Sequence, residues 1–192
     1  MTRLHLVRHG PTHAKTMVGW ADLPADLSDR AAIARLSAHL PSDAIVVSSD
    51  LSRAVDTANA IQGTRHRLPH HTDLREINFG TWELRAFAEI EAEDPELCFA
   101  YWDNPGEVRP PDGESWNEVR ARVDTVVDSL IAAHTGRDLI IVAHFGVILT
   151  QVQRALDSDA QQAFSHRIDN LSVTEITRHN NSWTVDRINH RP

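Results

Sequence analysis

The chain has 192 residues, a length that suits one domain or one domain with a small insertion. Its 27 acidic residues outnumber 19 lysines and arginines, and the resulting net charge of −8 argues against nucleic acid and membrane surfaces as partners. The single cysteine excludes an internal disulfide framework and a thiolate zinc cluster. Because no apolar run is long enough to span a bilayer and the first residues lack a signal-peptide pattern, we expect a cytoplasmic protein.

The first 50 residues alternate short apolar runs with a helix pattern. An apolar run at residues 4–8 is followed by a loop signal at residues 10–12, which predicts a buried strand. A helix is expected to begin after Ser28-Asp29, which offers a plausible N-cap, and to end before Pro41. Residues 44–48 predict a second strand. Strands separated by helices are typical of an α/β fold.

A second helix is predicted from residue 51 to about residue 62. Ser49 and Asp50 are the residue types that cap helix N-termini, and Gly63 suits the end of a helix. We therefore expect the first turn of this helix to be capped by its own preceding residues.

Residues 80–115 differ in character and predict a small helical cap inserted into the fold. Seven of the eleven aromatic residues fall between Phe79 and Trp116, and four prolines interrupt the same stretch. One interpretation is a satellite core that holds the insertion in place. The other is a cap over an active site that offers aromatic walls to a ligand.

The last third of the chain resumes the strand and helix pattern. Ser115 and Glu118 have the spacing of a capping box and open a long helix to about residue 133. Residues 139–143 form the most apolar predicted strand, and a helix is expected at residues 147–156.

A hairpin signal closes the chain. Two predicted strands, residues 172–178 and 183–189, flank Asn180-Asn181-Ser182. We therefore predict one domain over residues 1–192. Its fold would be a three-layer α/β/α sandwich, with a mostly parallel central sheet and an antiparallel edge strand.

Polar residues follow the predicted strands where ligands bind in open α/β sheets, beyond the carboxyl ends of the strands. Arg8 and His9 follow the first strand, and His144 follows the most apolar one. Arg53 lies one turn into the helix after the second strand. Two guanidinium groups and two imidazoles near helix N-termini would form an anion site that suits a phosphoryl group.

The twelve histidines of the chain also raise the question of a metal site. His5, His9 and His13 are spaced by four residues, which would place them on one face of a helix. The run around His5 predicts a strand instead, so the three imidazoles would not converge. We expect no metal and no other cofactor.

Several short blocks carry a resemblance to a known family, beginning with Leu-Val-Arg-His-Gly-Pro-Thr. The blocks are residues 6–12, 22–28, 48–58, 74–83, 112–115, 142–147 and 170–174. Through them the chain resembles the histidine phosphatase superfamily, also called phosphoglycerate mutase-like, over nearly its whole length. The resemblance implies a phosphoglycerate mutase-like fold and a phosphomonoester hydrolase that works through a phosphohistidine.

The resemblance also implies roles for individual residues. His9 would be the nucleophile, with one ring nitrogen free and the other held by an acceptor, which we expect to be a backbone carbonyl. Arg8, Arg53 and a protonated His144 would hold the phosphate oxygens. Glu76 would give a proton to the leaving alkoxide, and a bound phosphate dianion would raise the pKa of its carboxyl.

Five further residues are expected to contact substrate: Gly10, Thr12, Lys15, Trp20 and Phe145. Lys15 stands where many members of the family have an asparagine that touches phosphate. Phe145 stands where glycine is common, and its ring would narrow or line the pocket. Together with the aromatic insertion, Phe145 suggests a leaving group that is apolar or carries a ring.

Two alternatives to a phosphatase stay open at this point. Mutases of this type usually carry a Glu-Arg-His-Tyr-Gly block where residues 76–80 read Glu-Ile-Asn-Phe-Gly, which favours hydrolysis. A phosphate-binding module without activity would tend to lose His9 or Glu76, and both are present. The expected partner is a small phosphorylated metabolite, with no nucleic acid and no membrane, and a homodimer is left open.

Overall fold

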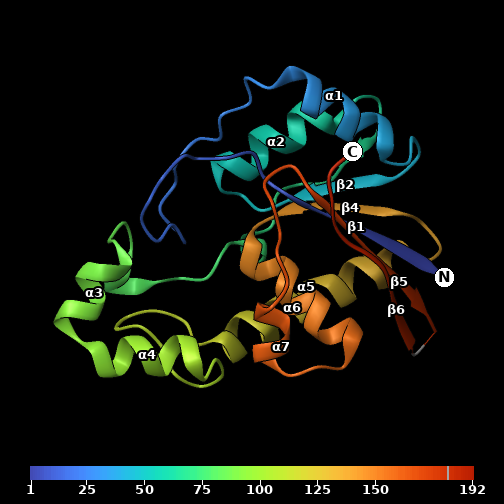
Figure 1. Cartoon of the computed structure of the whole chain (residues 1–192). Helices are drawn as coiled ribbons and strands as arrows, with labels where there is room; N and C mark the ends of the chain where they lie inside the picture. The colour runs from blue at the N-terminus through green and yellow to red at the C-terminus, as the bar shows by residue number, and fades with distance from the viewer. Residues whose placement is uncertain (181) are drawn as a thin grey trace.

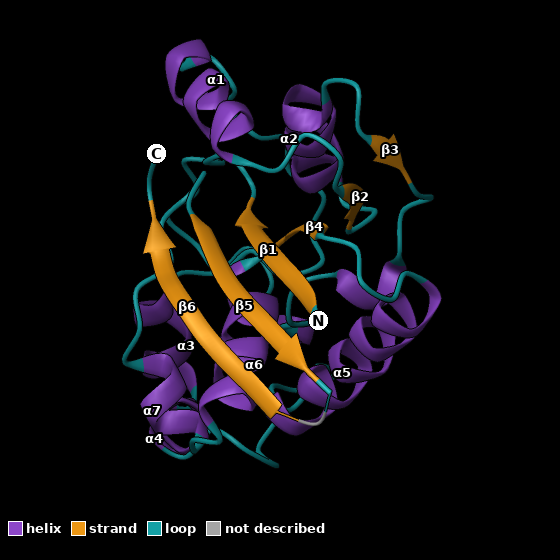
Figure 2. Cartoon of the chain, turned by 90° about the vertical axis from the view of Figure 1, so that its right-hand side faces the viewer, coloured by secondary structure: helices purple, strands orange, loops and turns teal. Residues whose placement is uncertain are grey.

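A six-stranded sheet forms the centre of the computed structural model, which describes residues 1–180 and 182–192. The strand order is β3-β2-β4-β1-β5-β6, and Figure 2 shows β1, β5 and β6 side by side. The strands are β1 (Thr2–Arg8), β2 (Ile45–Ser48), β3 (His66–Arg67), β4 (Leu139–Ala143), β5 (Val173–His179) and β6 (Ser182–His190).

The strand directions confirm a mostly parallel sheet with an antiparallel edge. Strands β1, β2, β3 and β4 are parallel to one another, whereas β5 is antiparallel to both β1 and β6, so the edge strand β6 pairs antiparallel with its neighbour. The reversed strand is therefore β5, second from the edge, and the edge strand β6 runs in the direction of β1. The hairpin that joins β5 to β6 causes this, and its Asn181 lies outside the described residues. Strand β3 was not predicted, because two residues carry no periodic pattern.

Helices cover both faces of the sheet, which confirms the three-layer sandwich. Figure 1 shows α1 and α2 on one face, α5, α6 and α7 on the other, and α3 and α4 to one side. Within the described ranges no helix has the length and apolar character needed to cross a membrane. The helices are α1 (Arg30–His39), α2 (Ser52–Gln62), α3 (Phe87–Glu93), α4 (Pro95–Asp103), α5 (Trp116–Ala133), α6 (Phe145–Leu156) and α7 (Ala160–Phe164).

The central strands bury side chains on both of their faces. In β1, Leu4 and Leu6 pack into the cluster that includes residues of α5 and α6, and Val7 packs into the cluster of α1 and α2. In β4, Ile141 and Ile140 are divided between the two clusters in the same way. Burial on both faces explains why these runs are apolar throughout.

Two predicted helix starts are confirmed by their caps. Asp29 accepts a hydrogen bond from the amide of Ala32 at 2.9 Å and caps α1. Ser115 and Glu118 form the predicted capping box, and α5 has the predicted bounds. Helix α6 begins at Phe145, two residues before the predicted start.

The predicted cap of α2 is wrong. The helix begins at Ser52, and its backbone amide donates to Oδ1 of Asp22, 2.7 Å away on a distant loop. Asp50 is engaged elsewhere, because its two carboxylate oxygens accept from Arg75 at 2.8 and 2.6 Å. Because Asp22 is 30 residues away from the start of the helix, no pattern near the helix could predict this cap.

Several aromatic residues of the insertion pack against one another and join the large core cluster that also holds residues of β1, β4, α5 and α6. Tyr101 lies edge-on to Trp82 at 5.4 Å and to Trp102 at 4.9 Å between ring centroids. Trp116 is buried and packs on Phe164 of α7 at 4.5 Å. These contacts hold the insertion against the main core, so its aromatic residues do not form a separate satellite core.

Candidate active site

A cavity of about 140 Å³ lies where β1 ends. Its walls combine the end of this strand, the loop after it, the first turn of α2 and the loop that carries Glu76. The lining residues are Arg8, His9, Thr12, Ala14, Thr16, Val18, Arg53 and Glu76. Four of the five residues expected to carry out the chemistry thus face one small space.

His9 is held as a neutral imidazole of defined tautomer. Its Nδ1 lies 2.6 Å from the carbonyl oxygen of Gly10, and its Nε2 accepts from Nε of Arg53 at 3.3 Å. A carbonyl only accepts and a guanidinium only donates, so Nδ1 carries the hydrogen and Nε2 the lone pair. Burial lowers the pKa of His9 to about 3, and the charges of Arg53 and Arg8 act in the same direction. The expected backbone acceptor is therefore the carbonyl of Gly10.

Arg53 is fixed before any substrate arrives. Its side chain is buried on α2, and its terminal nitrogens donate to the carbonyls of Ala21 at 2.8 Å and Gly19 at 2.6 Å. Thr57, one turn later, accepts from the amide of Gly10 at 2.9 Å. Helix α2 therefore positions both the guanidinium and the backbone beside His9.

The loop that holds Arg53 depends on a residue that sequence reasoning did not assign. The carboxylate of Glu83 accepts from three consecutive amides, those of Gly19 at 3.1 Å, Trp20 at 2.6 Å and Ala21 at 3.3 Å. A Cβ on Gly19 would lie 2.0 Å from the carbonyl oxygen of Ile77, so only glycine fits there. Glu83 is more than 60 residues from this loop, and the sequence carries no signal for the pairing.

Arg8 reaches the cavity from the end of β1. Its Nη1 donates to the carbonyl of Ile168 at 2.6 Å, and its guanidinium lies 5.5 Å from the ring centre of Phe145. The ring of Phe145 also packs against Phe164 and is not among the residues that line the cavity. The ring of Phe145 therefore lies against Arg8, and its expected role in lining or narrowing the substrate pocket stays a prediction.

His144 is fully buried immediately before α6, and its ring centroid is 5.0 Å from that of His9. Neither of its ring nitrogens has a hydrogen-bond partner within the described part of the chain. Burial lowers the pKa of His144 well below its ordinary value, and His9 and Arg53 contribute in the same direction. Without an anion, His144 is therefore neutral, whereas the protonated form was expected with phosphate bound.

Glu76 lies on the opposite wall and is 7% exposed. Its carboxylate accepts from the amides of Ile77 at 3.0 Å and Gly146 at 3.0 Å. Burial raises the pKa of Glu76, against the opposing effect of these two amides. A Cβ on Gly146 would lie 2.5 Å from Oε1 of Glu76, so the close approach of α6 requires glycine. The raised pKa has its cause in the protein itself, before any phosphate dianion adds to it.

The residues expected to contact substrate divide into two groups. Thr12 lines the cavity, whereas Gly10 is not among the lining residues and its backbone contacts His9 and Thr57 instead. Lys15 is exposed and is not among the lining residues. Trp20 is 38% exposed, donates from its indole nitrogen to the carbonyl of Glu76 at 2.8 Å, and likewise does not line the cavity.

A further residue near the site was also missed from the sequence. The side-chain amide of Asn170 donates to the carbonyl of His9 at 2.9 Å. It joins the loop before β5 to the end of β1, 161 residues away in sequence. Asn170 lies in a block that carries the family resemblance, which was the one available signal.

Comparisons with known proteins show what the chain is similar to. The family model of the histidine phosphatase superfamily (branch 1) matches residues 4–191. The adenosylcobalamin/alpha-ribazole phosphatase of Salmonella typhimurium is 30% identical to the chain over 175 residues, covering 87% of this chain and 86% of that protein.

Two further comparisons concern length and structure. A bifunctional protein of Mycobacterium tuberculosis is 33% identical over 191 residues, covering 91% of this chain and 50% of that protein. The chain thus spans about half the length of that relative. The solved structure of Bacillus stearothermophilus YhfR has a TM-score of 0.88 and 30% sequence identity, covering 97% of this chain and 96% of that one.

Proposed function

Because the chain belongs to the histidine phosphatase superfamily (branch 1), we propose that it hydrolyses small phosphate monoesters through a phosphohistidine on His9. The observation that carries this proposal is the state of His9. Its Nδ1 is tied to the carbonyl of Gly10, so the lone pair of Nε2 is directed to the side of Arg53 and the cavity. A neutral imidazole in this tautomer is a ready nucleophile.

In the first step, Nε2 of His9 attacks phosphorus, the N–P bond forms, and the ester P–O bond breaks. Arg53 now donates its Nε hydrogen to Nε2, and we expect this donor to turn to a phosphoryl oxygen when substrate binds. Arg8, Arg53 and His144 would stabilise the charge on the three non-bridging oxygens. Glu76, whose pKa is raised by burial, would in its protonated form give its proton to the leaving alkoxide.

In the second step, water attacks the phosphohistidine from the side vacated by the alcohol. The carboxylate of Glu76 takes a proton from this water, and the N–P bond breaks. His9 returns to its neutral form, and inorganic phosphate leaves. Glu76 therefore acts first as acid and then as base, as microscopic reversibility requires.

The cavity residues beyond those that would hold the phosphate are the ones that would contact the leaving group. Thr12, Ala14, Thr16 and Val18 supply small side chains, both hydroxyl and apolar, to a cavity of about 140 Å³. No aromatic residue of the insertion is among those that line this cavity, and Trp82, Tyr101 and Trp102 pack with one another, so the cavity itself gives no reason to expect a ring-bearing leaving group. We propose a small alcohol-derived ester as the substrate class.

The test is a hydrolysis screen over phosphorylated metabolites, with His9→Ala as the blank. We expect release of inorganic phosphate and a trapped phosphoenzyme that is labile in acid and stable in alkali. An acid-stable phosphoenzyme, or full activity of His9→Ala, would contradict the proposal. Transfer of phosphate to a second metabolite without its release would favour the mutase alternative. The scheme uses no metal, so activity in EDTA is expected to be unchanged.

A further inference from the structure

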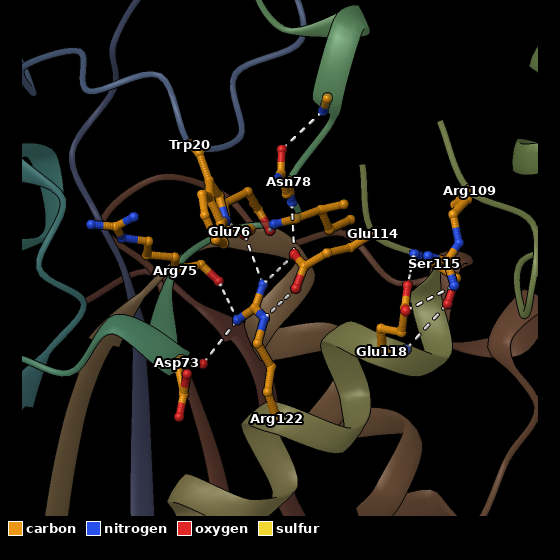
Figure 3. Close-up of polar contacts among 12 residues, drawn as sticks. Trp20, Asp73, Arg75, Glu76, Asn78, Arg109, Glu114, Ser115, Glu118 and Arg122 are labelled. Carbon is orange, nitrogen blue, oxygen red and sulfur yellow. Dashed lines mark hydrogen bonds and ion pairs between the residues drawn. The ribbon is translucent and has the colours of Figure 1, made fainter. Parts of the chain in front are cut away.

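A second polar cluster lies behind Glu76, outside the cavity, with Arg122 of α5 at its centre (Figure 3). The side chain of Arg122 is 15% exposed, and each of its three nitrogens donates. Nε and Nη2 donate to the two carboxylate oxygens of Glu114 at 2.8 and 2.9 Å. Nη1 donates to the carbonyls of Asp73 and Arg75, both at 2.8 Å, and Nη2 also to that of Glu76 at 2.9 Å.

This arrangement uses the full donor capacity of a guanidinium. Arginine offers five N–H groups in one plane, and here two serve the carboxylate of Glu114 and three serve backbone carbonyls. The bidentate pair of Arg122 with Glu114 is the geometry in which such ion pairs are strongest. A lysine has three donors on a flexible stem and cannot reproduce this set.

The segment held by Arg122 is the one that carries Glu76. Residues 75–79 belong to no helix or strand, so the backbone there has no regular hydrogen bonds of its own. The carbonyl of Glu76 accepts from Arg122 and also from the indole of Trp20 at 2.8 Å. The amide of Asn78 donates to Glu114 at 2.8 Å. The backbone is therefore fastened at residue 76 and again two residues later.

We propose that the ion pair of Arg122 and Glu114 positions the carboxyl of Glu76 for proton transfer. Neither residue lines the cavity, so both are positioning residues and not catalytic ones. The pair fixes the backbone of Glu76, while the amides of Ile77 and Gly146 fix its carboxylate. This inference rests on the proton-donor role proposed for Glu76. A displacement of about 1 Å in such a group can cost roughly 100-fold in rate.

The experiment compares two substrates whose leaving groups differ. We would measure kcat/KM for an alkyl phosphate, whose alkoxide needs a proton, and for p-nitrophenyl phosphate, whose leaving group needs little help. This ratio covers only the steps up to departure of the leaving group, so the later hydrolysis of the phosphoenzyme does not enter it. The variants are Arg122→Lys, which keeps the charge, and Glu114→Gln, which keeps the shape.

We expect both variants to lose roughly 10- to 100-fold in kcat/KM on the alkyl phosphate and less than about 3-fold on p-nitrophenyl phosphate. With p-nitrophenyl phosphate, kcat should fall and a burst of p-nitrophenolate should appear, because Glu76 would also be misplaced as the base of the second step. The matched control is Arg120→Lys on the same helix, whose partner is Asp124 at 3.6 Å. It should behave as the wild type on both substrates.

Equal losses on both substrates would overturn the inference. If the pair had only a structural role, its loss would lower the fraction of active enzyme by the same factor for both leaving groups. Glu76→Gln separates this from failure of the proposed function. If Glu76→Gln shows no preference between the two substrates, the proton-donor role itself fails. If Glu76→Gln loses more activity on the alkyl phosphate than on p-nitrophenyl phosphate, and the variants of Arg122 and Glu114 lose equally on both, only the positioning role fails. Should Arg122→Lys not fold, the ratio measured for Glu114→Gln decides alone.

Discussion

The two buried histidines make the site sensitive to acid before any substrate is present. His9 and His144 are neutral in the fold because burial lowers the pKa of each, whereas both would titrate near 6.5 in the unfolded chain. Protons therefore bind the unfolded chain first as pH falls. Stability that is complete above pH 6.5 is lost as pH falls towards the folded pKa of about 3 for His9.

Replacing His9 tests this directly. Between pH 8 and pH 5 the wild type should lose about 2 kcal/mol of unfolding free energy that His9→Asn does not lose. The measurement is urea denaturation in phosphate-free buffer, since an anion in the site would favour protonated His144. Parallel pH profiles for the two proteins would contradict a neutral, buried His9.

The contribution of Glu76 to stability depends on pH in the opposite direction to that of the two histidines. Its folded pKa is raised by burial, so its contribution to stability is complete below about pH 4.5 and is lost as pH rises through the folded pKa. At pH 7 the wild type should therefore be less stable than Glu76→Gln, whose amide oxygen can still accept from Gly146. The same variant should lose roughly 100-fold or more on alkyl phosphates. Thermal unfolding and kinetics of one preparation give both results, and a less stable Glu76→Gln would contradict the argument.

Gly146 offers a test that adds only one methyl group. A Cβ there would lie 2.5 Å from Oε1 of Glu76, so Gly146→Ala must push the carboxyl aside. We expect a loss of roughly 100-fold in kcat/KM on alkyl phosphates. Gly106→Ala is the matched control, because a Cβ at Gly106 meets nothing closer than 4.0 Å. Wild-type kinetics for Gly146→Ala would show that Glu76 does not need this contact.

At the scale of elements, helix α2 connects a cap to the site. Asp22 caps its first turn, and Arg53 lies in the same turn. Asp22→Ala should cost about 1 kcal/mol of stability and weaken binding of phosphate, because the start of α2 loses its partner. Asp29→Ala removes the cap of α1 and should cost a similar amount with no change in binding. Urea denaturation and phosphate titration distinguish the two, and unchanged binding by Asp22→Ala would show that the cap serves only stability.

The elements also show what the sequence could predict. The strands other than β3, helix α1 and helix α5 followed from apolar runs and local caps, because their determinants lie within a few residues. Arg8, His9 and His144 could be placed together because neighbouring parallel strands end at one edge of a sheet.

Other parts of the site had no local determinant. Glu83 and Arg122 contact segments 46 to 64 residues away, and a single charged residue in a sequence is typical of a solvated surface. The same limit applies to Asp22, which caps a helix 30 residues later. Side-chain packing could not be predicted from the sequence either. No pattern indicated that the ring of Phe145 would lie against Arg8.

At the scale of the whole molecule, the site is a small cationic cavity in a chain of net charge −8. The ring nitrogens of His144, one of which carries a hydrogen in the neutral imidazole, and the Nε of Arg8 are buried without hydrogen-bond partners in the described residues. Inorganic phosphate would supply acceptors, so it should stabilise the fold by about 2.7 kcal/mol at 100 times its Kd. Thermal unfolding in phosphate, compared with chloride at equal ionic strength, measures this. Arg53→Met should remove the effect, and an equal gain in that variant would assign it to the protein surface.

The place of β1 in the sheet has a consequence for how the protein is made. The strand that leads to His9 is synthesised before β4 and β5, between which it lies and whose residues come more than 130 positions later. On the ribosome, β1 therefore has neither of its neighbours until β4 and β5 have emerged. Contacts of such long sequence separation form slowly. Enzymatic activity should thus appear only at the last stage of folding, and a growing chain would hold its nucleophile without its pocket.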